Sequence, residues 1–180
     1  MRTRLTLSLA AVALAALPGC AGGTAPNDAA VAVQTDAQPS EQDRSWLRDS
    51  HGGNLAEIQA GRMAMRKGTT DQIKSLGEML LNDHTKLGHK VTRTAEQLGI
   101  QLPTSPNADQ RAVVRRLRES SGKEFDQDFL SGMVKAHTEA VAATKAEISG
   151  GSAPATKELA KTALPALEGH LSAIRKAQGD

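Results

Sequence analysis

The chain has 180 residues, with 22 lysines and arginines against 20 aspartates and glutamates, so its formal net charge is +2. Aromatic residues make up only 2% of the chain. A nearly neutral chain with few stacking rings lacks the features that nucleic-acid binding requires, so we expect no nucleic-acid partner. The single cysteine excludes an intramolecular disulfide, so the fold must be held together by packing.

The first twenty residues are typical of an export signal. Two arginines precede the uncharged apolar run Leu5–Leu17, which is too short to cross a bilayer as a helix. The run ends in Leu17-Pro18-Gly19-Cys20, which resembles a bacterial lipobox, whose cysteine is lipidated and becomes the mature N-terminus. We expect residues 1–20 to be a signal peptide and Cys20 to carry lipid. Cleavage without lipidation stays open, because the proline is unusual at its position.

Residues 21–42 are rich in Ala, Pro, Gly, Asp and Gln and show no periodicity, so we expect a flexible tether. The export signal places the protein in the bacterial cell envelope, at the periplasmic face of a membrane or free in the periplasm. Ala21, rather than an aspartate, follows Cys20, which resembles the outer-membrane sorting pattern. The expected partner is therefore a membrane, contacted through the N-terminal lipid, and a protein partner stays unidentified.

From Asp43 onward, apolar residues recur with helical spacing, and glycine, proline and capping residues mark the helix ends. The expected long helices are Asp43–Lys67, Thr70–Leu98, Lys123–Ser149 and Pro154–Ala177, with a short helix at Ala108–Ser120 after the N-cap Asn107. The run Thr69-Thr70-Asp71-Gln72 predicts a capping box. Gly52-Gly53 predicts a break or kink in the first helix, and Pro165 predicts a kink in the last.

Four long helices, two short loops and one long middle connection predict an all-α four-helix bundle over residues 43–178. The connection from Ile100 to Gly122 is long enough to span the bundle. It therefore permits ferritin-like topology, in which one crossover carrying a short extra helix joins the second and third long helices.

Near the middle of each long helix a polar residue lies in the apolar stripe or, on the first helix, at its edge. These residues are Glu57, His84, His137 and His170. Because the midpoints of matched helices share a level in a bundle, we expect these side chains to form one polar layer in the core. An unpaired buried polar group costs about 1–3 kcal/mol, so they should meet one another, a water or an ion. Asp83 and Glu168 flank two of the histidines, and Met133 lies one turn before His137.

Two interpretations of this layer stay open: a hydrogen-bonded layer that holds helix register, or a site for zinc or copper. Three imidazoles and one carboxylate suit either ion. The Met133 thioether favours copper(I) but is equally explained as core filling. A di-iron site is not expected, because Leu81, Val134 and Leu167 stand where Glu-x-x-His pairs would place a glutamate.

Several short motifs resemble a known family. They are Leu55-Ala56-Glu57-Ile58, Leu81-Asn82-Asp83-His84-Thr85, Phe125-Asp126, Val134-Lys135-Ala136-His137 and Leu164-Pro165-Ala166-Leu167-Glu168-Gly169-His170-Leu171. Taken in order, they are similar to the domain of unknown function 4142 family over about Asp43–Ala177. The resemblance implies a ferritin-like bundle in an exported bacterial protein. It implies no activity, because the family's function is unassigned.

No feature of the sequence names a reaction, and Gly-x-Ser-x-Gly, a phosphate loop and His-Glu-x-x-His are all absent from it. We therefore expect an exported, lipid-anchored bundle that acts without catalysis, as an envelope interaction or stress-related module. The alternative is a periplasmic metal-binding protein that holds zinc or copper in the central His/Glu layer. His51 and His89 are expected to be solvated.

Overall fold

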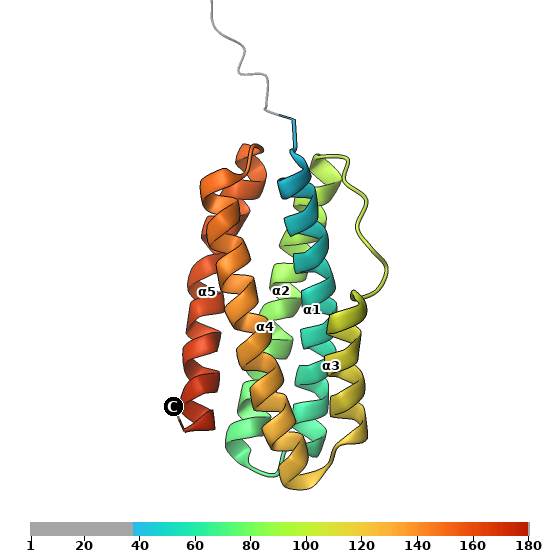
Figure 1. Ribbon diagram of the computed structural model, residues 1–180, viewed down its shortest axis with the longest axis vertical. Helices are drawn as coiled ribbons and strands as arrows, with labels where there is room; N and C mark the ends of the chain where they lie inside the picture. Colours follow the sequence, from blue (N-terminus) through green and yellow to red (C-terminus); the bar gives the residue numbers. More distant parts are fainter. Residues whose placement is uncertain (1–37, 180) are drawn as a thin grey trace, which may run out of the picture. The chain divides into compact units, whose positions relative to one another are not determined.

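The computed structural model describes residues 38–179, which form five helices (Figure 1). The helices are α1 Glu41–Lys67, α2 Asp71–Gln97, α3 Ala108–Glu119, α4 Gly122–Gly150 and α5 Pro154–Gln178. This range contains no strand, which confirms the all-α class. None of its helices combines the length and the apolar character needed to cross a membrane. The expected signal peptide, Cys20 and most of the expected tether lie outside the described residues.

The four long helices form two antiparallel hairpins, α1 with α2 and α4 with α5. In Figure 1, α2 ends at the top of the bundle, and the chain then returns along α1, through α3, to the start of α4 at the bottom. This single crossover leaves α2 and α4 parallel, which is the ferritin-like arrangement and confirms the expected fold. The short helix α3 packs beside the lower part of α1.

Helix α1 continues through Gly52-Gly53, so the expected break there is wrong. The crossover packs against the helix at this point. A Cβ atom on Gly52 would lie 2.6 Å from Gln110 Oε1 and 3.5 Å from the Cα atom of Pro106. Gln110 Nε2 also donates to the Asp49 carbonyl at 3.2 Å. The missing side chain of Gly52 therefore lets the crossover pack close to α1, and the glycine does not end the helix. Helix α5 is likewise helical on both sides of Pro165.

Side-chain caps fix where the helices begin. The N-cap Asn107 and Gln110 exchange hydrogen bonds between side chain and backbone, as expected for α3. The capping box expected at α2 is wrong by one residue, because Thr70 rather than Thr69 is the N-cap and its hydroxyl accepts from the backbone of Ile73. A full box instead opens α1, where Ser40 pairs with Asp43.

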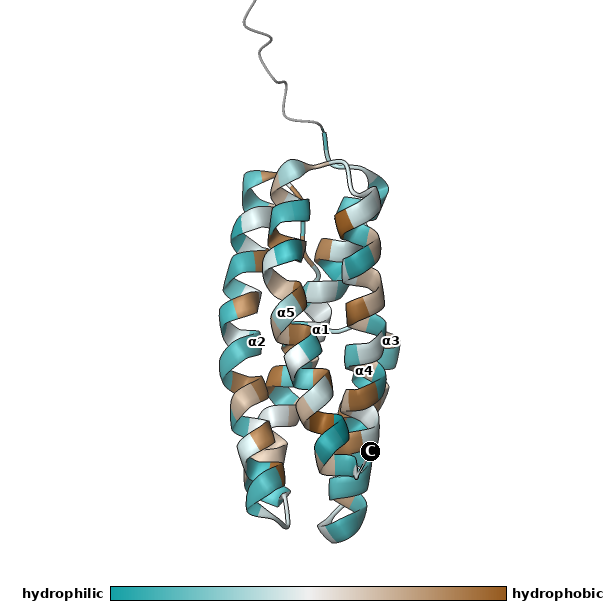
Figure 2. Ribbon diagram, turned by 90° about the vertical axis from the view of Figure 1, so that its left-hand side faces the viewer, coloured by the Kyte–Doolittle hydropathy of each residue, from teal (hydrophilic) through white to brown (hydrophobic). Residues whose placement is uncertain are grey.

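The core consists of two apolar clusters, one in each half of the bundle. The lower cluster contains both phenylalanines, and the upper cluster contains the only tryptophan, Trp46. Hydrophobic and hydrophilic residues alternate along each helix, as Figure 2 shows, so every long helix contributes a stripe to the interior. On α2, α4 and α5, the histidine singled out from the sequence lies between the stretches that belong to the two clusters, and on α1 Glu57 directly follows Ala56, the first residue of the lower cluster on that helix.

Candidate metal centre

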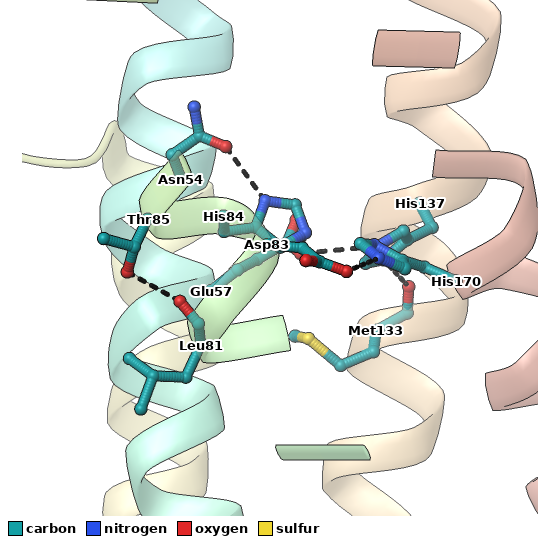
Figure 3. Close-up of polar contacts among 9 residues, drawn as sticks. All are labelled: Asn54, Glu57, Leu81, Asp83, His84, Thr85, Met133, His137 and His170. Carbon is teal, nitrogen blue, oxygen red and sulfur yellow. Dashed lines mark hydrogen bonds and ion pairs between the residues drawn. The ribbon is translucent and has the colours of Figure 1, made fainter. Parts of the chain in front are cut away.

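The four polar residues meet at mid-height of the bundle, one from each long helix (Figure 3). Glu57 on α1 is 6% exposed, His84 on α2 is 2% exposed, His137 on α4 is fully buried and His170 on α5 is 5% exposed. The apolar clusters close the layer above and below. Water therefore has little access to these groups, and their charges and lone pairs must be balanced within the layer.

The inner atoms of the layer lie close together. Glu57 Oε2 is 2.8 Å from His84 Nε2 and 3.4 Å from His137 Nε2. His137 Nε2 is 3.3 Å from His170 Nδ1. One ring nitrogen from each histidine lies within 4.8 Å of the corresponding nitrogens of the other two. Three ring nitrogens thus surround one small volume, and the Glu57 carboxylate lies beside two of them, those of His84 and His137.

The outer nitrogen of each histidine ring is engaged by an acceptor. His137 Nδ1 donates to the Met133 carbonyl at 3.0 Å, and His170 Nε2 donates to Asp83 Oδ2 at 3.1 Å. His84 Nδ1 donates to Asn54 Oδ1 at 2.9 Å. Carbonyl and carboxylate oxygens accept but do not donate, so the ring proton sits on the outer nitrogen. The inner nitrogens of the neutral rings then carry lone pairs that point into the layer.

Burial and charge set the ionisation of the layer. Burial alone would raise the pKa of Glu57, but the neighbouring histidines, His84 above all, outweigh it and lower the pKa to about 2. Burial alone would lower the pKa of His84, but the Glu57 carboxylate raises it. Burial lowers the pKa of both His137 and His170. Without a bound cation, Glu57 and His84 therefore form an ion pair, and the other two rings are neutral.

This arrangement directs lone pairs inward in a way that suits a cation. Two neutral rings, His137 and His170, face each other at 3.3 Å with lone pairs on both sides and no proton between them. Glu57 Oε2 and His84 Nε2 are close, yet neither atom has a hydrogen-bond partner of acceptable geometry. Around a tetrahedral zinc ion with bonds of about 2.0–2.1 Å, neighbouring donor atoms lie about 3.3 Å apart. The Glu57–His137 and His137–His170 separations, 3.4 and 3.3 Å, are close to such edges, whereas the Glu57–His84 separation of 2.8 Å is shorter.

The flanking residues predicted from the sequence divide into two groups. Asp83 belongs to the site, because it orients His170. Glu168 does not: it is exposed and pairs with Lys145 at 2.7 Å. Met133 contributes its carbonyl oxygen, while its side chain packs in the lower apolar cluster, beneath the layer in Figure 3. The thioether therefore serves as core filling in this arrangement.

One site residue, Asn54, was missed by sequence reasoning. It lies three residues before Glu57, so both project from the same face of α1, and this spacing was the available signal. Of the two histidines expected to be solvated, His89 is exposed, as expected. His51 is half-buried, and burial lowers its pKa, so that expectation is wrong.

Comparisons with known proteins agree with this fold. The family described as "Domain of unknown function (DUF4142)" matches residues 28–177. A solved structure from Deinococcus radiodurans, a crystal structure of a DUF305 fragment, is similar with a TM-score of 0.68. The similarity has 15% identity and covers 78% of this chain and 97% of the other, so it shows the fold alone. A search of curated proteins gave no significant match. The chain belongs to the domain of unknown function 4142 family.

Proposed function

We propose that the protein binds one divalent transition-metal ion, zinc or copper, at the centre of the bundle. The donors are Glu57 Oε2, His84 Nε2, His137 Nε2 and His170 Nδ1. The observation that supports this most strongly is the engagement of every outer ring nitrogen by an acceptor. Such contacts fix the tautomer of metal-binding histidines and orient their free nitrogens toward the ion.

A purely hydrogen-bonded layer accounts for the same residues less well. Such a layer needs a proton between His137 and His170, but their outer nitrogens already hold the ring protons and burial disfavours a second proton on either ring. A cation satisfies all the inward lone pairs at once. We infer that Glu57 completes four-coordination beside the three histidines and that the site binds without catalysis, because catalytic zinc sites keep one position open.

Metal titration of protein purified without an affinity tag tests this proposal. After chelator treatment and dialysis, calorimetry with Zn²⁺ should give one site per chain. His137→Ala should abolish this binding, and His89→Ala, which changes an exposed histidine of α2, should leave it unchanged. Saturating zinc should also stabilise the wild type, by about 2.7 kcal/mol at a free concentration of 100 times Kd.

A structural layer gives a different result. In that case neither zinc nor copper binds the wild type stoichiometrically, and His137→Ala destabilises the fold by about 1–3 kcal/mol whether or not metal is present. That outcome would reject the metal proposal and leave the envelope interaction module, the leading expectation from the sequence, as the better account.

We also propose that the metal-binding bundle is exported and attached to a membrane through lipid on Cys20. The apolar run Leu5–Leu17 and the lipobox-like Leu17-Pro18-Gly19-Cys20 support this proposal. A mature bacterial lipoprotein carries several acyl chains, and more than one chain is needed for stable anchoring. Cys20→Ser should therefore move the protein from the membrane fraction to the soluble fraction of the producing cell. Unchanged fractionation would reject lipid anchoring.

A further inference from the structure

We propose that a groove between α1 and α4 is the path by which the metal cation reaches and leaves the central layer. This inference rests on the proposed metal-binding function. The groove, called the α1–α4 groove below, is a cavity of about 610 Å³ that opens at the surface beside α3. Glu57 and His84 lie on its inner wall, whereas its outer part is formed by side chains of α1, α3 and α4.

The Glu57–His84 ion pair lies at the inner end of the groove. Glu57 Oε2 and His84 Nε2 are buried, lack hydrogen-bond partners and belong to residues that line the cavity. A cation moving inward would therefore meet a carboxylate and an imidazole before it met the two neutral histidines behind them. No helix that carries a donor has to move away from the others for this to happen.

Small side chains keep the α1–α4 groove open. The residues on its walls include Ser45 and Gly53 of α1 and Ala136, Ala140 and Ala143 of α4. Helix α3 also contributes to the walls of the groove, through Asp109, Gln110 and Val113. The two hairpins are thus packed tightly within themselves but leave space between α1 and α4.

The walls of the groove carry mainly negative charge. Asp49 of α1 and Asp109 of α3 are exposed carboxylates on its wall. Glu139 also lines the groove, but its carboxylate lies 3.9 Å from the ammonium group of Lys135, which lines the groove as well. These two charges therefore offset each other. A cleft lined by one sign of charge concentrates ions of the opposite sign and accelerates their binding. The α1–α4 groove therefore favours a metal cation over an anionic ligand.

The opposite side of the layer, between α2 and α5, is less suited to a cation. There the Asp83 carboxylate accepts a hydrogen bond from His170 Nε2 at 3.1 Å. Asp83 therefore covers the histidine on this side. The Lys86 ammonium lies 3.2 Å from the same carboxylate and is exposed. An incoming cation on this side would meet a positive charge and an occupied carboxylate, so we assign access to the α1–α4 groove.

Stopped-flow mixing of the metal-free protein with Co²⁺ tests the path, with the cobalt absorption as the signal. Asp49→Asn/Asp109→Asn should lower the association rate constant roughly threefold to tenfold at low ionic strength. The difference should shrink at 1 M salt, where the Debye length is about 3 Å. The matched control Glu78→Gln/Glu96→Gln neutralises two exposed carboxylates of α2 and should leave the rate unchanged.

A second variant blocks the groove sterically. Ala140→Trp fills the cavity without replacing any donor, so association and dissociation should slow together, roughly tenfold or more, while Kd stays the same within about twofold. Lys86→Gln removes the charge on the opposite side and should not change the association rate. An increase with Lys86→Gln would instead identify the α2–α5 side as the path.

The two proposals fail in distinguishable ways. If wild-type protein does not bind Co²⁺ stoichiometrically, the metal-binding function itself is rejected. If it binds Co²⁺ but Ala140→Trp and Asp49→Asn/Asp109→Asn both associate at the wild-type rate, the site stands and the α1–α4 groove is not its path.

Discussion

At the scale of single residues, the proposed metal site depends on groups that would not touch the ion. Asp83 holds the outer nitrogen of His170, as Asn54 does for His84 and the Met133 carbonyl does for His137. These acceptors fix which nitrogen of each ring faces inward. If such a contact is lost, the ring is free to rotate or to change tautomer, and metal affinity falls even though every donor is still present.

We predict that Asp83→Ala weakens zinc binding about 10-fold to 100-fold without abolishing it. The remaining donors still define a site, but His170 loses its orienting partner. Calorimetric titration at fixed pH measures the change. Glu168→Ala is the matched control, because this residue is also acidic and close to His170 in sequence, but pairs with Lys145 at the surface. Equal losses in the two variants would show that the Asp83 contact has no special role.

The apolar stripes of α2, α4 and α5 predicted that their histidines enter the core, because a histidine in register with leucines must point the same way, whereas on α1 the expected apolar face included Met65, which is exposed. The partners of those side chains were harder to predict. Asn54 lies on a helix face without a distinctive pattern, and the Met133 carbonyl is a backbone group that no residue type marks. The spacing of apolar residues shows which face of a single helix points into the core. Contacts between helices also depend on how each helix is rotated about its axis and on the side-chain rotamers.

At the scale of helices, two glycines set the contact between α1 and α2. A Cβ atom on Gly61 would lie 2.5 Å from the Gly77 carbonyl oxygen, and one on Gly77 would lie 2.6 Å from the Ala64 Cβ atom. The two helices therefore approach each other closely enough that only glycine fits. Glycine is read from sequence as a helix breaker, but here, as at Gly52, it serves packing instead.

We predict that Gly77→Ala lowers the free energy of unfolding by roughly 1–3 kcal/mol, because the added methyl group overlaps a backbone and a side chain that cannot both move. Gly169→Ala is the control: its Cβ atom would have no neighbour within 4 Å, so improved helix propensity should stabilise the protein by about 0.5–1 kcal/mol. Urea denaturation of the metal-free proteins measures both. A stabilising Gly77→Ala would contradict the packing account.

At the scale of the whole molecule, a pair of buried carboxyl groups joins the start of α1 to the end of the other hairpin. The Asp43 carboxylate accepts from the backbone N–H groups of Ser152 and Ala153, at 3.1 and 3.0 Å, in the loop between α4 and α5. Glu147 of α4 interacts with Asp43 and accepts from Gln42 Nε2 at 3.2 Å. These contacts close the upper end of the bundle.

The two carboxyl groups titrate in opposite directions. Burial raises the pKa of Asp43, but hydrogen bonds from Ser40, Glu147 and the loop backbone outweigh it and lower the pKa to about 2. Burial and the hydrogen bond with Asp43 raise the pKa of Glu147 to about 7, against the opposing effects of Gln42 and of the Lys157 charge. Between about pH 4.5 and 7 the folded protein therefore holds a proton on Glu147 that the unfolded chain has lost.

We predict that this proton makes the metal-free protein lose stability as the pH rises from about 4.5 to 7, since stability falls with pH wherever the folded state binds more protons. Glu147→Gln keeps a donor toward Asp43 without ionising, so it should remove this loss and be more stable than the wild type at pH 8. Urea denaturation at pH 5 and pH 8 in the presence of a chelator measures the effect. Both proteins contain the central histidines. Their contribution therefore cancels when the unfolding free energy of the wild type is subtracted from that of the variant. Glu96→Gln, at an exposed position of α2, should show no such difference. If Glu147→Gln tracks the wild type at both pH values, the carboxyl pair does not control how the stability of the molecule depends on pH.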